Sequence, residues 1–225
     1  MPTWTALPRT AALRAARRLL PVSLRASLKA YRGLRLPDSQ WDWDYASGAW
    51  RGLHSGQELP RYSVIVGYCR QLRPSGSVLD IGCGEGLLAR WLAGACPRYF
   101  GIDLSSEAIA LAPAKNLPFA EFAVADAAEF RPMSQFDVIV FNECLIYFER
   151  PLELVARLAD ALLPGGVIIV SLNEGVMSRQ IWRMLRGGFR VLEQVEIRNR
   201  GVWRIGVLQS RPSPATDAAG AASQD

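Results

Sequence analysis

The middle of the chain alternates two local patterns, and this alternation constrains the fold more than any other feature of the sequence. Short runs rich in β-branched and aromatic residues are followed by segments in which apolar side chains recur at helical spacing. Strands that alternate with helices favour a parallel sheet with right-handed crossovers and helices on both faces. Strands are predicted at residues 77–81, 99–104, 119–124, 136–142 and 167–172, and helices at residues 87–95, 107–112 and 152–163.

The C-terminal part departs from this alternation. Residues 190–198 and 202–209 are two strand-like runs, and the sequence Asn199-Arg200-Gly201 between them predicts a turn. We therefore expect an α/β fold that ends in an antiparallel hairpin. Beyond Ser210 the chain consists largely of Pro and small residues, so residues 211–225 are expected to form a disordered tail.

The first predicted strand runs into a loop that contains Gly82, Gly84 and Gly86. Glycine lets the backbone turn sharply, and it lets a ligand approach bare main chain beside the N–H groups of the following helix. The spacing is GxGxG, because residue 87 is Leu, and so it does not match the GxGxxG fingerprint of nicotinamide-dependent enzymes. Asp80 lies two residues before the first glycine, where its oxygens suit either the loop or a ligand ammonium group.

Acidic residues also stand at the ends of the next two predicted strands. Asp103 ends the second strand, where a carboxylate can accept hydrogen bonds from both hydroxyls of a ribose. Asp126 follows the third strand, within reach of an adenine amino group. These positions favour a ligand that contains a nucleoside, although each acidic residue taken singly is also compatible with a helix cap or a turn.

Five segments of the chain resemble, in the same order, the motifs of class I S-adenosylmethionine-dependent methyltransferases. The resemblance implies S-adenosylmethionine as the cofactor and a Rossmann-like, mostly parallel sheet of seven strands whose last strand is antiparallel. The segments are residues 80–86, 101–105, 125–127, 136–140 and 163–166. The resemblance assigns Gly82, Gly84 and Gly86 to the methionine part of the cofactor, Asp103 to the ribose, Asp126 to the adenine, and Leu104 and Ala127 to the apolar walls of the adenine pocket.

The loop after the fourth predicted strand is expected to reach both the cofactor and the acceptor, as it commonly does in this superfamily. Asn142 is a candidate contact for the cofactor ammonium group. Glu143 is a second candidate for that contact and a candidate base for the acceptor, and Tyr147 is expected to shape the acceptor cavity. The alternative for Glu143 is that it caps a short helix.

Residues 38–75 are predicted to form a helical, aromatic cap ahead of the methyltransferase domain at residues 76–210. The segment from Trp41 to Trp50 is rich in tryptophan and aspartate, residue types that stack on sugars and bind hydroxyls but can equally anchor a lid. The pattern of Trp50, Glu58 and Arg61 is similar to the N-terminal cap of NodS-like methyltransferases, which modify an amino group on an oligosaccharide. That resemblance implies that Trp50 and Arg61 approach the cofactor, with Arg61 on its carboxylate.

One histidine and four separated cysteines leave no pattern for a metal site. His54 is a candidate base, because histidine titrates near neutral pH, and the alternative is a structural role. No apolar run approaches the roughly 18 residues of a membrane-spanning helix. Buried thiols and a cytoplasmic location are therefore expected.

The net charge of +5 comes from the N-terminal arm, residues 1–37, which holds eight of the 26 basic residues and no acidic one. The remainder has 18 basic and 21 acidic residues, which argues against a nucleic-acid partner for the body of the protein. Basic and apolar side chains of the arm segregate at helical spacing, a pattern typical of peripheral contact with an anionic membrane. Packing on the domain, disorder and an organellar transit peptide are the alternatives.

The sequence thus predicts a methyltransferase that modifies a hydroxyl or amino group of a small-molecule or saccharide acceptor. No Asn-Pro-Pro-Tyr-type sequence follows the fourth predicted strand, which disfavours adenine or glutamine as the acceptor. Two other classes stay open: a non-catalytic, cofactor-binding partner subunit, and an RNA methyltransferase that is anchored by the basic arm.

Overall fold

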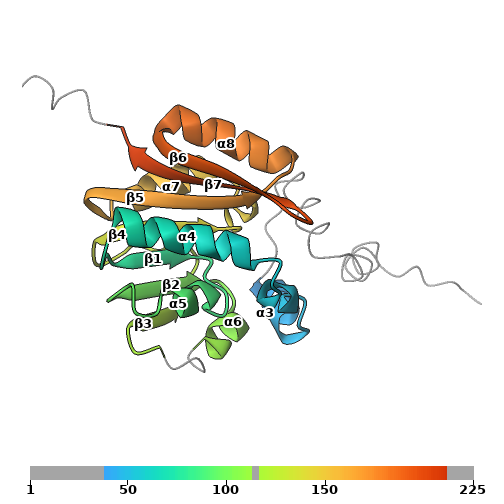
Figure 1. The fold of residues 1–225 in the computed structure, drawn as a ribbon. Coiled ribbons are helices and arrows are strands. Elements are labelled where there is room, and N and C mark those ends of the chain that lie inside the picture. The colour runs from blue at the N-terminus through green and yellow to red at the C-terminus, as the bar shows by residue number, and fades with distance from the viewer. Residues whose placement is uncertain (1–37, 113–116, 212–225) are drawn as a thin grey trace, which may run out of the picture.

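A computed structural model describes residues 38–112 and 117–211 as a seven-stranded sheet with helices on both faces (Figure 1). The strand order is β3-β2-β1-β4-β5-β7-β6, with parallel pairs from β3 to β5 and antiparallel pairs from β5 to β6. The α/β, Rossmann-like fold with a terminal hairpin is thereby confirmed. The strands are β1 (Val78–Ile81), β2 (Tyr99–Asp103), β3 (Ala120–Val124), β4 (Phe136–Asn142), β5 (Leu162–Asn173), β6 (Phe189–Arg198) and β7 (Val202–Ser210).

The core is divided by the sheet into two layers, because successive side chains of a strand point to opposite faces. On β4, Val138 and Val140 pack against one layer, and Ile139 and Phe141 against the other. The first layer includes buried residues of α4 (Leu59–Leu72) and α5 (Leu87–Leu92), and the second includes those of α7 (Pro151–Ala159) and α8 (Val176–Gly188). The remaining helices are α3 (Asp38–Ala46), η1 (Arg51–His54), α6 (Ser106–Leu111) and η3 (Leu145–Tyr147).

The largest differences from the sequence prediction concern three elements, β5, α7 and α8. Strand β5 begins at Leu162 rather than at residue 167, and α7 ends at Ala159. The Pro-Gly-Gly sequence lies inside the strand, where Gly165 has a φ of +75° and the register against β4 shifts. Residues 176–188, for which the sequence pattern predicted no element, form α8 and bury Ser178, Ile181, Trp182 and Leu185 along one face.

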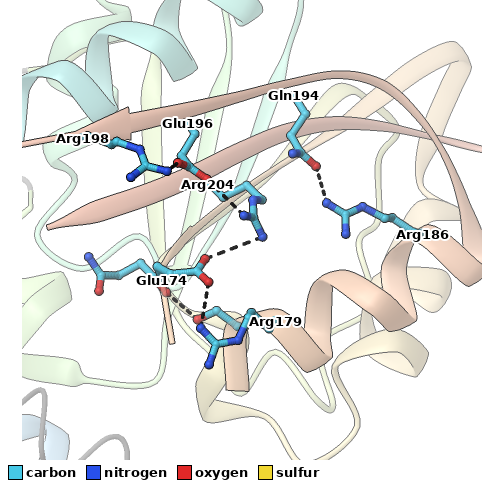
Figure 2. A network of polar contacts seen from close by, with 9 residues as sticks. Glu174, Arg179, Arg186, Gln194, Glu196, Arg198 and Arg204 are labelled. Atoms are coloured by element: carbon cyan, nitrogen blue, oxygen red, sulfur yellow. Dashed lines mark hydrogen bonds and ion pairs between the residues drawn. The ribbon is translucent and has the colours of Figure 1, made fainter. Parts of the chain in front are cut away.

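The carboxyl end of β5 and the hairpin β6–β7 are joined to α8 by ion pairs (Figure 2). Glu174 contacts Arg179 at 3.0 Å and Arg204 at 3.6 Å, and Arg204 contacts Glu196 of β6 at 3.1 Å. Glu174 and Arg204 are largely buried, so solvent screens this part of the network less than it screens surface pairs. The network holds together three elements at the edge of the sheet where the parallel strands end.

Residues 38–75, predicted as a cap, take two structural roles. Helix α3 lies near the carboxyl ends of the parallel strands, whereas α4 packs on the sheet through Tyr62, Ile65 and Val66 (Figure 1). The boundary at residue 76 stays a prediction. The N-terminal arm (residues 1–37) and residues 212–225 lie outside the described residues.

Within residues 38–112 and 117–211, no helix combines the length and apolar character needed to cross a bilayer. The four cysteines are buried and free.

Candidate functional site

A cavity of about 620 Å³ opens at the carboxyl ends of the parallel strands, below the aromatic residues of α3. Such a volume suits a small-molecule site. Twelve of the fourteen predicted site residues line it, and His54 and Gly86 do not. The lining residues among those predicted are Trp50, Arg61, Asp80, Gly82, Gly84, Asp103, Leu104, Asp126, Ala127, Asn142, Glu143 and Tyr147.

The glycine loop takes its shape from three left-handed residues, with φ of +70° at Gly82, +55° at Gly84 and +69° at Gly86. A Cβ atom on Gly84 would lie 2.6 Å from the Tyr45 hydroxyl, so the loop has no room for a side chain there. A Cβ atom on Gly86 would lie 2.7 Å from the ring of Phe122 on β3. Gly86 therefore serves the packing of α5 on the sheet, and its predicted contact with the cofactor has no counterpart in the lining of the cavity.

Asp103 at the end of β2 organises this loop. Its Oδ2 accepts a hydrogen bond from the backbone N–H of Gly84 at 2.8 Å, and its Oδ1 accepts one from the backbone N–H of Ser105 at 2.9 Å. Burial raises the pKa of the Asp103 carboxyl group, and the backbone donors counteract that shift. The carboxylate lines the cavity with acceptor capacity left on both oxygens, as ribose binding requires.

Asp80 supplies the clearest unfilled interaction of the cavity. Its Oδ2 accepts a hydrogen bond from the Tyr99 hydroxyl at 2.5 Å, whereas the buried Oδ1 has no hydrogen-bond partner among the described residues. Burial raises the pKa of Asp80 to about 7. A buried carboxylate oxygen normally has a donor, and the ammonium group of S-adenosylmethionine is a donor of the right kind. The residues present therefore fit this cofactor.

Arg61 of α4 is 2% exposed and lines the cavity from the cap side. Its Nε and Nη2 donate to Glu58 Oε2 at 3.1 and 2.7 Å, and its Nη1 donates to Asn142 Oδ1. The sequence pattern predicted roles for Arg61 and Asn142 but none for Glu58, whose carboxylate orients the guanidinium group. The spacing of three residues at the start of a helix was the signal that could have identified it.

Glu143 has a φ of +61° and is bound to the end of β5. Its backbone N–H donates to Ser171 O at 2.9 Å, its Oε1 accepts from the Ser171 hydroxyl at 2.7 Å, and its Oε2 accepts from Asn173 N–H at 2.8 Å. Burial raises the pKa of Glu143, while Arg61 and the two hydrogen bonds oppose that shift. The side chain is thus occupied by β5 and does not cap η3, whose N-cap residue is Cys144.

Four aromatic rings form the roof of the cavity. Trp41 stacks on Trp50 with ring centroids 6.4 Å apart, and it meets Tyr147 edge to face at 4.8 Å. Tyr45 lies 5.9 Å from Trp50. The indole N–H of Trp50 is buried and has no hydrogen-bond partner within the part of the chain that the structure describes. Tyr147 is half-buried, and burial raises its phenol pKa.

His54 lies outside the cavity, and its side chain is 44% exposed. Its Nε2 pairs with Glu85 Oε1 in the glycine loop, and Glu85 lines the cavity whereas His54 does not. On the opposite side of the cavity, Asp126 Oδ1 accepts a hydrogen bond from Ala128 N–H at 3.0 Å and shapes the loop after β3. The described residues contain no group of three or more His, Cys, Asp or Glu side chains that could hold a metal ion.

The chain is similar to known methyltransferases in sequence and in fold. The methyltransferase domain family matches residues 56–195. An O-methyltransferase of ubiquinone biosynthesis from Burkholderia multivorans is 35% identical over 106 residues, which is 44% of this chain and 46% of the relative. The corresponding protein of Paraburkholderia phytofirmans is 34% identical over 108 residues, 45% of this chain and 47% of the relative. The match thus spans about half the length of these curated relatives.

Two solved structures share the fold. The N-methyltransferase NodS from Bradyrhizobium japonicum WM9, in complex with S-adenosyl-L-homocysteine, superposes with a TM-score of 0.64 at 20% identity, over 73% of this chain and 92% of that one. The DhpI complex with S-adenosyl-L-homocysteine gives a TM-score of 0.58 at 19% identity, over 75% and 94% of the two chains. At this identity the likeness concerns the fold.

Proposed function

Because this chain belongs to the class I S-adenosylmethionine-dependent methyltransferases, we propose that it methylates a hydroxyl or amino group of a small-molecule or saccharide acceptor. The observation that carries the proposal is the cavity itself. It is roofed by Trp41, Tyr45, Trp50 and Tyr147 and bordered by the carboxylate of Glu143. Aromatic rings beside carboxylates suit an acceptor that has both flat apolar faces and polar hydrogens.

The cofactor, when bound, supplies a methyl group that is already activated on a sulfonium centre. The chain then has to align the acceptor with that group and exclude water. Asp103 and Asp126 would hold the nucleoside of the bound cofactor, and Arg61 would hold the carboxylate of its amino-acid part. The four rings of the roof keep the acceptor in place, and Glu143 receives the proton that the acceptor loses.

The names of the relatives favour one acceptor to test beside saccharides. They are O-methyltransferases of ubiquinone biosynthesis, so a ring hydroxyl of a quinone-type compound is a second candidate. Both candidates are small molecules with flat faces, and the same cavity features support both.

The proposal is tested by incubating the full chain with S-adenosylmethionine that carries a labelled methyl group. The acceptor panel holds oligosaccharides with free amino groups, their N-acetylated forms, neutral sugars, dihydroxybenzenes and RNA. We expect label in a low-mass product, and none with Asp103→Ala. Label found only in RNA would replace the proposal with the RNA methyltransferase, and binding of S-adenosylhomocysteine without transfer to any acceptor would favour the non-catalytic subunit.

A second experiment, on the basic N-terminal arm, distinguishes an RNA methyltransferase from the proposed function. Affinity for RNA and for anionic vesicles is measured with the full chain and with a variant that lacks residues 1–37, over a range of salt concentrations. Phosphate contacts make RNA affinity fall steeply with salt. If the arm conferred strong, salt-dependent RNA binding, the RNA methyltransferase would become the better interpretation. Binding to vesicles alone supports the predicted peripheral membrane contact.

A further inference from the structure

The backbone of Glu143 adopts a left-handed conformation, with a φ of +61°, which is unfavourable for a residue with a side chain. Such a conformation persists only where the surrounding contacts impose it, and it is often found at functional sites. At Glu143 these contacts come from the end of β5, namely the carbonyl and hydroxyl groups of Ser171 and the N–H group of Asn173.

Ser171 is an unusual residue for its position, because it is polar and lies in the core. It is fully buried, between the core residues Val170 and Leu172, in a strand whose neighbouring positions are apolar. A buried hydroxyl group needs a hydrogen-bond partner, and that of Ser171 donates to Glu143 Oε1 at 2.7 Å. The hydroxyl group is therefore directed at a carboxylate that lines the cavity.

The position of Ser171 is itself fixed from outside the cavity. Glu174, three residues further along, pairs with Arg179 of α8 and Arg204 of β7 (Figure 2). These pairs hold the end of β5 against its neighbours, so Ser171 and Asn173 present their donors from a rigid element. Each Glu143 oxygen accepts one of these donors, which leaves further acceptor capacity on both oxygens.

We infer that Ser171 is a positioning residue for methyl transfer, because its hydroxyl orients the Glu143 carboxylate so that the remaining acceptor sites meet the nucleophilic O–H or N–H of the acceptor. This inference rests on the proposed function. As the new bond from the nucleophile to the methyl carbon forms, the carbon–sulfur bond breaks and its electron pair stays on sulfur. The proton of the nucleophile passes to Glu143.

Several charged or titratable groups face Glu143. Arg61 of α4 favours its ionised form, Glu58 disfavours it, and Tyr147 and Cys144 of the same loop interact with it. Removal of the Ser171 hydroxyl takes away one donor to the carboxylate and leaves these groups in place. We therefore expect the carboxyl group to hold its proton up to a higher pH in Ser171→Ala than in the wild type.

The test compares the wild type with Ser171→Ala, Ser171→Cys and Ser171→Thr. The pH dependence of kcat/KM is measured with the acceptor found above. In Ser171→Ala and Ser171→Cys the acidic limb should move up by about one pH unit, since a hydrogen bond to a charged group is worth roughly a tenfold preference or more. Ser171→Thr keeps the hydroxyl and should restore the wild-type limb. The Cys variant fills the space of the serine but lacks its hydroxyl group, so it still tests the inference if the Ala variant does not fold.

Ser178→Ala is the matched control. Ser178 is also buried and also bonds to the end of β5, through Asn173 O at 2.5 Å, but its hydroxyl is directed at this carbonyl and not at Glu143. The acidic limb of this variant should match that of the wild type. Affinity for S-adenosylhomocysteine, measured by calorimetry, should change less than about twofold in all the serine variants, because Ser171 does not line the cavity.

A second readout does not need turnover. In protein labelled with ¹³C at the glutamate carboxyl carbon, the signal of Glu143 is identified by its loss in Glu143→Gln, and it is titrated by NMR. An upward shift of this titration in Ser171→Ala supports the inference, and an unchanged titration together with an unchanged acidic limb overturns it. If no acceptor is methylated by the wild type, the proposed function fails, and an unchanged NMR titration then also overturns the role of Ser171.

Discussion

The Asp42 carboxylate of α3 accepts a hydrogen bond from the Ser105 hydroxyl at 2.8 Å. Ser105 also donates its backbone N–H to Asp103 Oδ1 at 2.9 Å, and its hydroxyl oxygen caps α6 by accepting from Ala108 N–H at 3.2 Å. One serine thus connects the aromatic segment over the cavity to the carboxylate proposed to bind the ribose. Asp42 Oδ1 takes two weaker donors at 3.3 Å, the Ser106 hydroxyl and the Glu107 N–H.

This connection predicts that Asp42→Ala weakens the binding of S-adenosylhomocysteine about tenfold, because one charged acceptor for several donors is lost. Asp42→Asn keeps an acceptor oxygen at that place and should lose much less. Ser106→Ala removes only a long contact and serves as the control. Calorimetric titration measures all three, and equal affinities for wild type and Asp42→Ala would show that α3 is not coupled to the cofactor site.

The raised pKa of the Asp80 carboxyl group predicts that the stability of the protein depends on pH. Its pKa of about 7 in the folded protein exceeds the ordinary value, so the folded state binds more protons than the unfolded state between about pH 4 and 7. The contribution of Asp80 to the free energy of unfolding is therefore greatest at low pH and falls as pH rises through this range. Denaturant unfolding at several pH values should show this fall in the wild type and lose it in Asp80→Asn.

The affinity for the ligand should change with pH in the opposite direction to the stability. An ammonium group binds the ionised carboxylate, so affinity for S-adenosylhomocysteine should rise several-fold as pH increases through about 7. Asp80→Asn should flatten this dependence as well as weaken binding. A slope that is the same in wild type and Asp80→Asn would assign the ammonium contact to another group.

Gly84 is predicted to be required for steric reasons as well as for its backbone conformation. An alanine Cβ atom would lie 2.6 Å from the Tyr45 hydroxyl oxygen but 3.5 Å from the ring carbon that carries it. Gly84→Ala should therefore reduce stability by more than the roughly 1–2 kcal/mol of a left-handed alanine. Adding Tyr45→Phe should recover the excess, because it removes the nearest atom.

Gly94 offers the matched control for this prediction. It has a φ of +74°, and among the described residues no atom lies within 4 Å of the place that an added Cβ atom would take, so Gly94→Ala measures the backbone cost alone. Denaturant unfolding of the three variants separates the two contributions. Equal losses of stability in Gly84→Ala and Gly94→Ala would show that a clash with Tyr45 does not contribute to the cost at Gly84.

The parts of the fold that the structure confirms are those that short segments determine. The glycine loop, Asp80 and Asp103 lie within local motifs at strand ends, and a parallel sheet brings such ends to one edge. The seven-stranded architecture followed from the alternation of strands and helices together with the family resemblance.

The contacts that were not predicted join residues far apart in the chain. Ser171 lies 28 residues from Glu143, and nothing in either local sequence indicates the hydrogen bond between them. His54 has the chemistry of a base, but only the packing of η1 against the glycine loop shows that it pairs with Glu85 and does not itself line the cavity. Gly86 lies in a local motif, but its close approach to the ring of Phe122 on another strand could not be read from that motif.

Glu58 and Arg61 give the final prediction. A guanidinium group has five N–H donors. Arg61 directs three of them to Glu58 Oε2 and Asn142, and its side chain also interacts with Tyr62. We predict that its remaining donor capacity holds the carboxylate of the cofactor. We expect Arg61→Ala and Trp50→Ala to weaken S-adenosylhomocysteine binding by about tenfold or more. Unchanged affinity in both variants would show that the N-terminal cap does not contribute to the cofactor site.

Glu58→Gln tests whether the orientation of Arg61 matters apart from its charge. The amide keeps one acceptor oxygen but loses the charge that holds a buried guanidinium group, so binding should weaken several-fold and less than in Arg61→Ala. Glu196→Gln, in an ion pair with Arg204 outside the cavity lining, is the control and should bind as the wild type does. If Glu58→Gln also bound like the wild type, Arg61 would hold its position through Asn142 and the packing of α4 alone.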